Sequence, residues 1–178
     1  MSSMRFAFGL FLLGSMTITL SAQNSPPPPP RPAPPPEARQ FDFWVGEWDV
    51  FDPSGKKVGE NSIQLAHNNW VLIENWRGAS GSTGSSLNLF NNADPKHWTQ
   101  YWADNTGGEL YMKGGLVNGS MVLEEKSTDA EGHAVVNRTT WTPRADGTVR
   151  QLWETSTDGG KTWQTTFDGI YHRKPTKS

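Results

Sequence analysis

The chain has 178 residues, of which 16 are Lys or Arg and 18 are Asp or Glu, and its formal net charge at pH 7 is −2. The charges are interspersed, with no basic stripe and no amphipathic membrane face, so the composition argues against nucleic acid and lipid surfaces as partners. The chain contains no cysteine, which excludes disulfides and a lipoprotein attachment site. A folded domain in this chain must therefore be stabilised by its core alone.

Residues 1–22 are predicted to be a signal peptide. One cation, Arg5, precedes an apolar run from Phe6 to Leu20, and small residues close the segment at Ala22. The run is shorter than the ~20 residues that a spanning helix needs, so an uncleaved anchor is the less favoured alternative. We expect an exported protein, periplasmic or secreted after cleavage near Ala22, with no stable membrane insertion of the mature chain.

Proline dominates residues 23–40, which include the uninterrupted run from Pro26 to Pro30. Proline lacks an amide donor and favours extended polyproline II, so this segment is predicted to be a linker. A proline ligand for an aromatic groove on a partner is the alternative. The folded domain is expected over 41–173, followed by a short tail, 174–178.

Turn residues recur about every ten to twelve positions along the domain, from Asp52-Pro53-Ser54-Gly55 to Asp158-Gly159-Gly160. Short alternating runs lie between the turns, and no long helical period occurs, so the domain is predicted to be all-β. Hairpin-length connections indicate an antiparallel up-and-down meander of about ten strands, closed into a barrel that leaves no open edge. A sandwich is the alternative, but its crossings would need longer loops.

The domain opens with an aromatic stretch, Phe41-Asp42-Phe43-Trp44-Val45-Gly46-Glu47-Trp48-Asp49-Val50. Trp44 and Trp48 are four residues apart, so one short helical turn would place both rings on one face. Gly46 would then allow the chain to bend into the first strand. This turn is expected to cap one end of the barrel.

The same stretch carries a resemblance to known proteins. Gly46-x-Trp48 before a first strand resembles the entry motif of the calycins, the lipocalin and fatty-acid-binding-protein barrels. The string Phe-Asp-Phe-Trp-x-Gly-x-Trp-x-Val is also similar to the opening of a family of small exported bacterial proteins with a predicted lipocalin-like fold and unknown function. The resemblance covers 41–173 and implies a fold but no activity.

Barrel closure would place the last strand beside the first and bring Arg173 near Trp48. A guanidinium stacked on an indole stabilises by ~0.5–2 kcal/mol, and the pair would be similar to the arginine-over-tryptophan seal of lipocalins. A solvated arginine beside a basic tail is the alternative. If the pair exists, it holds the barrel shut and does no chemistry, so Gly46, Trp48 and Arg173 are assigned structural roles.

Residues 156–163, Ser-Thr-Asp-Gly-Gly-Lys-Thr-Trp, match the Asp-box hairpin that recurs in sialidases and other β-proteins. Asp158 would accept hydrogen bonds from turn amides while Trp163 packs under the turn. A glycosidase propeller would need several copies and a much longer chain. The box is therefore expected to shape the hairpin between the last two strands.

Strand phasing places polar and aromatic side chains together on the predicted inner face. The sets are Leu72, Glu74 and Trp76; Ser86, Asn88 and Phe90; Trp98, Gln100 and Trp102; Val136, Arg138 and Thr140; and Val149, Gln151 and Trp153. Large rings beside a few polar groups describe a small-molecule pocket. The predicted ligand-binding residues are Glu74, Trp76, Asn88, Gln100, Trp102, Arg138, Gln151 and Trp153.

A buried Glu74 needs either a partner cation, for which Arg138 is the candidate, or a proton. The two could simply satisfy each other. If the phase is shifted by one residue, both face solvent, and the lining becomes Val71, Ile73, Leu87 and Leu89.

The four histidines, His67, His97, His133 and His172, lie on different segments without metal-ligand spacing, so no metal site is predicted. Some ten-stranded haem barrels bind iron through a histidine near the position of His172, which makes haem a minor possibility, although the glycine-spaced tryptophan motif of that group is absent. No nucleophile elbow, phosphate loop or Cys–His pair occurs, so no catalytic residue is predicted.

Three functions fit these observations, while the sequence specifies neither the ligand nor the oligomeric state. The first is a binding module for a small apolar or amphipathic molecule with a polar head. The second is an enzyme of the same shape that uses Glu74 or His172 as a general base. The third is a filled barrel with a structural or interaction role. A cavity of ~300 Å³ or more would favour the first two.

Overall fold

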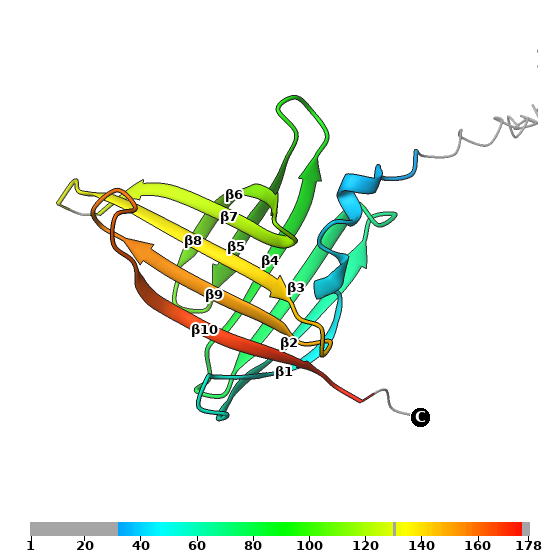
Figure 1. Ribbon diagram of the computed structural model, residues 1–178, viewed down its shortest axis with the longest axis horizontal. Coiled ribbons are helices and arrows are strands. Elements are labelled where there is room, and N and C mark those ends of the chain that lie inside the picture. The colour runs from blue at the N-terminus through cyan, green and yellow to red at the C-terminus, as the bar shows by residue number, and fades with distance from the viewer. Residues whose placement is uncertain (1–31, 130, 176–178) are drawn as a thin grey trace, which may run out of the picture. The chain divides into compact units, whose positions relative to one another are not determined.

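Ten antiparallel strands form a closed barrel in the computed structural model, which describes residues 32–129 and 131–175 (Figure 1). The predicted signal peptide and the first part of the predicted linker, up to residue 31, lie outside the described residues. No helix in the described ranges is long and apolar enough to span a membrane. The elements in chain order are the 3-10 helices η1 (Pro36–Arg39) and η2 (Asp42–Trp44) and the strands β1 (Gly46–Phe51), β2 (Lys57–Ala66), β3 (Val71–Gly78), β4 (Thr83–Asn91), β5 (His97–Asp104), β6 (Glu109–Val117), β7 (Ser120–Thr128), β8 (Ala134–Pro143), β9 (Val149–Ser156) and β10 (Gln164–Arg173).

The strands run as an up-and-down meander. Each strand pairs with its neighbour in the chain, and β1 pairs with β10 to close the barrel. The connections are tight. The β6–β7 turn, for example, consists of Asn118 and Gly119, whose φ angles of 49° and 81° suit the type I′ geometry of two-residue hairpins. The prediction of a closed antiparallel barrel is confirmed, and the sandwich alternative is wrong.

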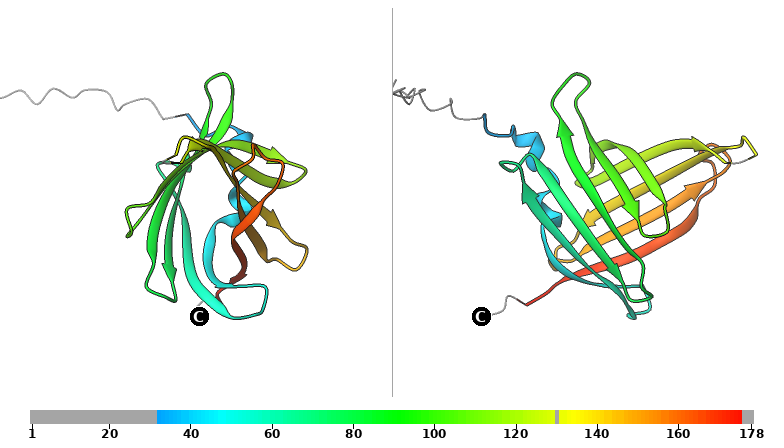
Figure 2. Two further views of the ribbon diagram at one scale, coloured as in Figure 1. Left: turned by 90° about the vertical axis from the view of Figure 1, so that its left-hand side faces the viewer. Right: turned by 180° about the vertical axis from the view of Figure 1, so that it is seen from behind.

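The two 3-10 helices lie at one end of the barrel (Figure 2). Phe41 and Trp44 are fully buried there, with ring centroids 4.9 Å apart and planes inclined by 17°. Both rings also contact Trp141 of β8, at 5.1 and 5.4 Å. Ala38 of η1 is buried as well, so the last residues of the predicted linker contribute to the fold. The aromatic opening of the domain thus fills this capped end.

Arg173 fastens the cap to the closing strand pair. Its Cζ lies 4.3 Å from the centroid of the Trp48 ring. The guanidinium donates to the carbonyl oxygens of Val45 at 2.9 Å and Phe43 at 3.4 Å. A Cβ at Gly46 would overlap the guanidinium, which is why a glycine stands at the entry to β1. The contact predicted between the chain's first and last strands is therefore present.

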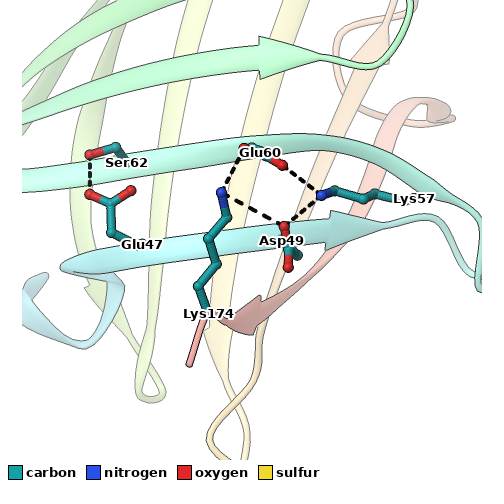
Figure 3. Close-up of polar contacts among 6 residues, drawn as sticks. All are labelled: Glu47, Asp49, Lys57, Glu60, Ser62 and Lys174. Atoms are coloured by element: carbon teal, nitrogen blue, oxygen red, sulfur yellow. Dashed lines mark hydrogen bonds and ion pairs between the residues drawn. The ribbon is translucent and has the colours of Figure 1, made fainter. Parts of the chain in front are cut away.

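Lysines and acids link the outer faces of β1 and β2 to the residue after β10 (Figure 3). Lys174 binds Glu60 at 2.6 Å, and Lys57 binds both Glu60 at 2.6 Å and Asp49 at 2.7 Å. The hydrogen bonds from Lys174 and Lys57 lower the pKa of Glu60 to about 2. Because these side chains are partly exposed, the ion pairs are expected to contribute little to the stability of the barrel.

The Asp-box forms the connection between β9 and β10. The Asp158 carboxylate accepts hydrogen bonds from the amides of Lys161 and Thr162, both at 2.9 Å. It also accepts from the Thr162 hydroxyl at 2.6 Å, and these contacts lower its pKa to about 2. The indole of Trp163 donates back to the Gly160 carbonyl at 3.0 Å. The hydrogen bonds of the box are thus internal to the turn, as its sequence indicated.

Replacing Asp158 with alanine is expected to loosen this hairpin without changing ligand binding, because the carboxylate serves turn amides. The melting temperature should fall, and amide hydrogen exchange at Lys161 and Thr162 should speed up. Asp146→Ala is the matched control, because the Asp146 carboxylate accepts a hydrogen bond from the Thr148 amide at 2.9 Å in the β8–β9 turn. This variant should leave exchange at Lys161 and Thr162 unchanged. Weaker ligand binding at an unchanged melting temperature would contradict this assignment.

Candidate functional site

The barrel interior changes character along its axis. The capped end is filled with rings, including those of Phe41, Trp44, Trp98 and Trp141. Buried polar side chains form the next layer. Beyond them lies a cavity of about 360 Å³, which extends to Ser80 and Ser82 in the β3–β4 loop at the far end. The barrel is therefore filled in one half and hollow in the other.

Six of the eight predicted ligand-binding residues line this cavity. β3 contributes Glu74 and Trp76, β5 contributes Gln100 and Trp102, and β9 contributes Gln151 and Trp153. The predicted inward phase of these three strands therefore agrees with the structure. A seventh residue, Asn88 of β4, is fully buried in the polar layer beneath the cavity.

The eighth residue, Arg138, does not point into the barrel, and the predicted Glu74–Arg138 pair is wrong. Arg138 lies on the outer face of β8, where it donates to Glu154 at 2.9 Å and its Cζ lies 3.7 Å from the centroid of the Trp163 ring. The prediction placed Val136, Arg138 and Thr140 on the inner face of this strand. Thr139 and Trp141 point inward instead, because the large Trp141 ring packs in the capped core.

On β4, unlike β8, the predicted phase is correct and the alternative phase is not realised. Leu87 and Leu89, which would have lined the lumen in that case, are 48% and 37% exposed. Residues alternate across a strand, so their exposure fits the inward position of Ser86 and Asn88.

His172 faces away from the cavity. It is exposed, and its ring packs edge-on against Phe51 at 5.2 Å. Its neighbour Tyr171 lines the cavity, so the two side chains lie on opposite faces of β10. The roles considered for His172, as a general base or a haem ligand within the barrel, are therefore wrong.

The polar layer is organised around Glu74, which is only 3% exposed. Asn61 donates to its Oε1 at 2.7 Å, and Ser86 donates to its Oε2 at 2.5 Å. No basic side chain of the described residues contacts this carboxyl group. Burial raises the pKa of Glu74 to about 7, and the two hydrogen bonds oppose part of that rise.

Tyr171 joins the same layer from β10. Its hydroxyl accepts a hydrogen bond from Asn61 at 3.2 Å and donates to Gln151. Burial, followed by the nearby Glu74 charge, raises the pKa of Tyr171 well above its usual value. Tyr171 is therefore a neutral donor at any physiological pH.

Most of the donors in this layer are directed at other protein groups. Asn88 donates to Ser86 at 2.8 Å, and Gln100 donates to Asn88 at 2.9 Å. Ser86 in turn donates to Glu74. One acceptor is left over: Oδ1 of Asn61 is buried and has no hydrogen-bond partner within the described part of the chain. The described part of the layer therefore contains at least one acceptor without a donor.

Three indoles and a phenyl ring form the walls above this layer. The rings of Trp76 and Phe167 meet edge to face at 5.8 Å. The indole N–H groups are held by neighbouring side chains, such as Trp153 by Asn137 at 3.1 Å and Trp102 by Asp104 at 3.5 Å. Each indole is thereby fixed through its polar edge.

Sequence reasoning missed the glycines that make room for two of these rings. A Cβ at Gly59 would overlap the Trp76 ring, and a Cβ at Gly84 would overlap the Trp102 ring. A glycine inside a strand weakens it unless something must approach closely, so these two positions were a usable signal. Asn61 and Tyr171 were also missed as members of the site.

Comparison with protein-family models and with curated proteins gives no match. The closed ten-stranded antiparallel barrel is compatible with a calycin-like fold.

Proposed function

We propose that this protein is an exported, lipocalin-like barrel that binds a small apolar or amphipathic molecule with a polar head. The polar head would reach Glu74 with the indoles beside it, and the apolar part would extend past Val58, Leu110 and Phe167 toward the open end. The observation that carries this proposal is the hollow half of the barrel, about 360 Å³ in volume.

Two features of the cavity support binding over a purely structural role. Its volume falls within the usual range of ligand pockets, ~300–1,000 Å³, and its lining combines apolar walls with a few convergent polar groups. A structural barrel would gain stability by filling this half with side chains, as the capped half is filled. A buried carboxyl group without a cation is costly, and such costs are concentrated at functional sites.

An enzyme acting in the same cavity is the second candidate, and one observation favours it. The pKa of Glu74, about 7, suits a general base at neutral pH. The bound molecule distinguishes the two candidates, because a binding protein releases it unchanged whereas an enzyme converts it.

Native mass spectrometry of protein purified from its own host tests the proposal, with release and identification of any bound molecule. The same preparation tests export, since N-terminal sequencing should find a new terminus near Gln23. Thr166, which lines the cavity, and the adjacent Thr165, which does not, are both exposed and give a matched pair of variants. Thr166→Trp should fill the mouth and reduce occupancy at least tenfold, whereas Thr165→Trp should retain the molecule. Equal occupancy in both variants would contradict binding in this cavity.

A further inference from the structure

The polar head of the ligand can be specified further, on the basis of the proposed function. We propose that the cavity selects a protonated amine, with the Glu74 carboxylate as its counter-ion and the indoles of Trp76, Trp102 and Trp153 around the cation. The ligand class is thus an amphipathic ammonium compound.

The charge of the cavity lining favours a cationic head. Among the described residues that line the cavity, Glu74 is the one whose side chain carries a formal charge. Arg138, the cation that would have received an anionic head, lies outside and is bound to Glu154 and Trp163. An anionic head would face Glu74 without a compensating cation, whereas a cationic head would supply the partner that the buried carboxylate lacks.

The hydrogen-bonding capacity of Glu74 favours a head that donates. A carboxylate offers about four lone-pair sites, and Glu74 uses two of them for Asn61 and Ser86. The donors of Asn88, Gln100 and Tyr171 are already directed at protein acceptors. An ammonium group carries only donors, so it matches the acceptor capacity that remains at the cavity floor.

The aromatic walls of the cavity also favour a cation. A cation over an indole face gains ~0.5–2 kcal/mol, and more where water is excluded. The N–H groups of Trp102 and Trp153 donate to Asp104 at 3.5 Å and to Asn137 at 3.1 Å, which orients both indoles. Three indoles beside one buried carboxylate provide the two contacts that recognise ammonium ions.

The proposal has a pH signature, because the carboxyl must be ionised to act as a counter-ion. Within the described ranges, Tyr171 on β10 is the titratable group that faces Glu74, and its raised pKa keeps it neutral. The neighbours from β2 and β4, Asn61 and Ser86, do not titrate. Since the pKa of free Glu74 is about 7, amine affinity should fall roughly tenfold per pH unit below that value.

The test uses decylamine, decan-1-ol and decanoate, which share one tail and differ in the charge of the head. Each is titrated into the full-length protein at concentrations below self-association, with tryptophan fluorescence and calorimetry as readouts. At pH 8 we expect decylamine to bind at least tenfold more tightly than decanol, and decanoate to bind most weakly. Between pH 7 and 5.5 decylamine should weaken while decanol stays constant.

Glu74→Gln keeps the shape of the side chain and removes its charge. The ratio of the affinities for decylamine and decanol should then fall to about one, and its pH dependence should disappear. Glu109→Gln is the control, because Glu109 begins β6, is exposed, and pairs with Tyr101 at 2.8 Å on the outer face. This variant should retain the preference.

The outcomes separate the two proposals. If decanol and decanoate bind as tightly as decylamine, or Glu74→Gln keeps the preference, the ammonium assignment is wrong while small-molecule binding stands. If none of the three probes binds and no molecule co-purifies from the host, both proposals are wrong. The pH series on the unsubstituted protein tests the ammonium assignment without any variant.

Discussion

Raising the pH from 4.5 to 7 is expected to lower the free energy of unfolding by about 3 kcal/mol through Glu74 alone. Its pKa rises from the ordinary value of 4.5 to about 7 in the folded protein, because burial disfavours the charge. The folded state therefore holds a proton that the unfolded state has already released in this range. Stability contributed by the neutral carboxyl is fully present below pH 4.5, declines as the pH rises, and levels off above 7.

Urea unfolding at a series of pH values checks this prediction, with Glu74→Gln as the comparison. The amide has no proton to release in this range, so the variant should lack the decrease in the free energy of unfolding between pH 4.5 and 7. At pH 8 the variant should therefore be more stable than the natural protein. Glu109→Gln should follow the natural protein. The carboxylates of Glu60 and Asp158, whose pKa values are about 2, lose their contributions only as the pH falls below about 4. If the free energy of unfolding varies with pH in the same way for Glu74→Gln and the natural protein, Glu74 is solvated and the prediction is wrong.

Replacing Trp44 with alanine is expected to lower the free energy of unfolding by about 3–5 kcal/mol, the usual range for a large buried ring. Trp44 is 0% exposed, stacks on Phe41, and lies 5.4 Å from Trp141. Its removal leaves a void that the surrounding rings can fill only in part.

Equilibrium urea unfolding measures the loss, and Tyr111→Ala serves as the exposed aromatic control. Tyr111 is 50% exposed on the outer face of β6, so its loss should cost less than about 1 kcal/mol. An unchanged urea slope for Trp44→Ala would show that the barrel still unfolds as one unit. A loss below about 1 kcal/mol would show that the cap is not an integral part of the core.

The fold was predictable because its signals are local. Turn residues mark the ends of hairpins, and a tryptophan beside a polar residue indicated the correct inward face on β3, β5 and β9. β8 failed because its inner face depends on Trp141, whose contacts with Phe41 and Trp44 come from the distant start of the domain. Val136 offered a local signal that pointed the other way.

The site was predictable only in part, because its centre is made by barrel closure. Asn61 and Tyr171 are 110 residues apart in the chain and hydrogen-bond to each other across the interior. Periodicity within either strand cannot reveal such a pair. The outward contacts that hold Arg138 were equally hidden, since Trp163 belongs to a hairpin whose sequence indicates only a local role.

The pairing of β1 with β10 has a consequence for how the chain folds. Every other pairing joins strands that are consecutive in the chain, so each can form as a hairpin within microseconds, whereas this one must bring together segments more than 100 residues apart. Until β10 docks, β1 and β9 present two unpaired edges that can join with other chains. Arg173 and Lys174 contact the cap and β2 only once docking is complete. We therefore expect docking of the last strand to be the slow step of folding and to end the period in which these edges are open to other chains.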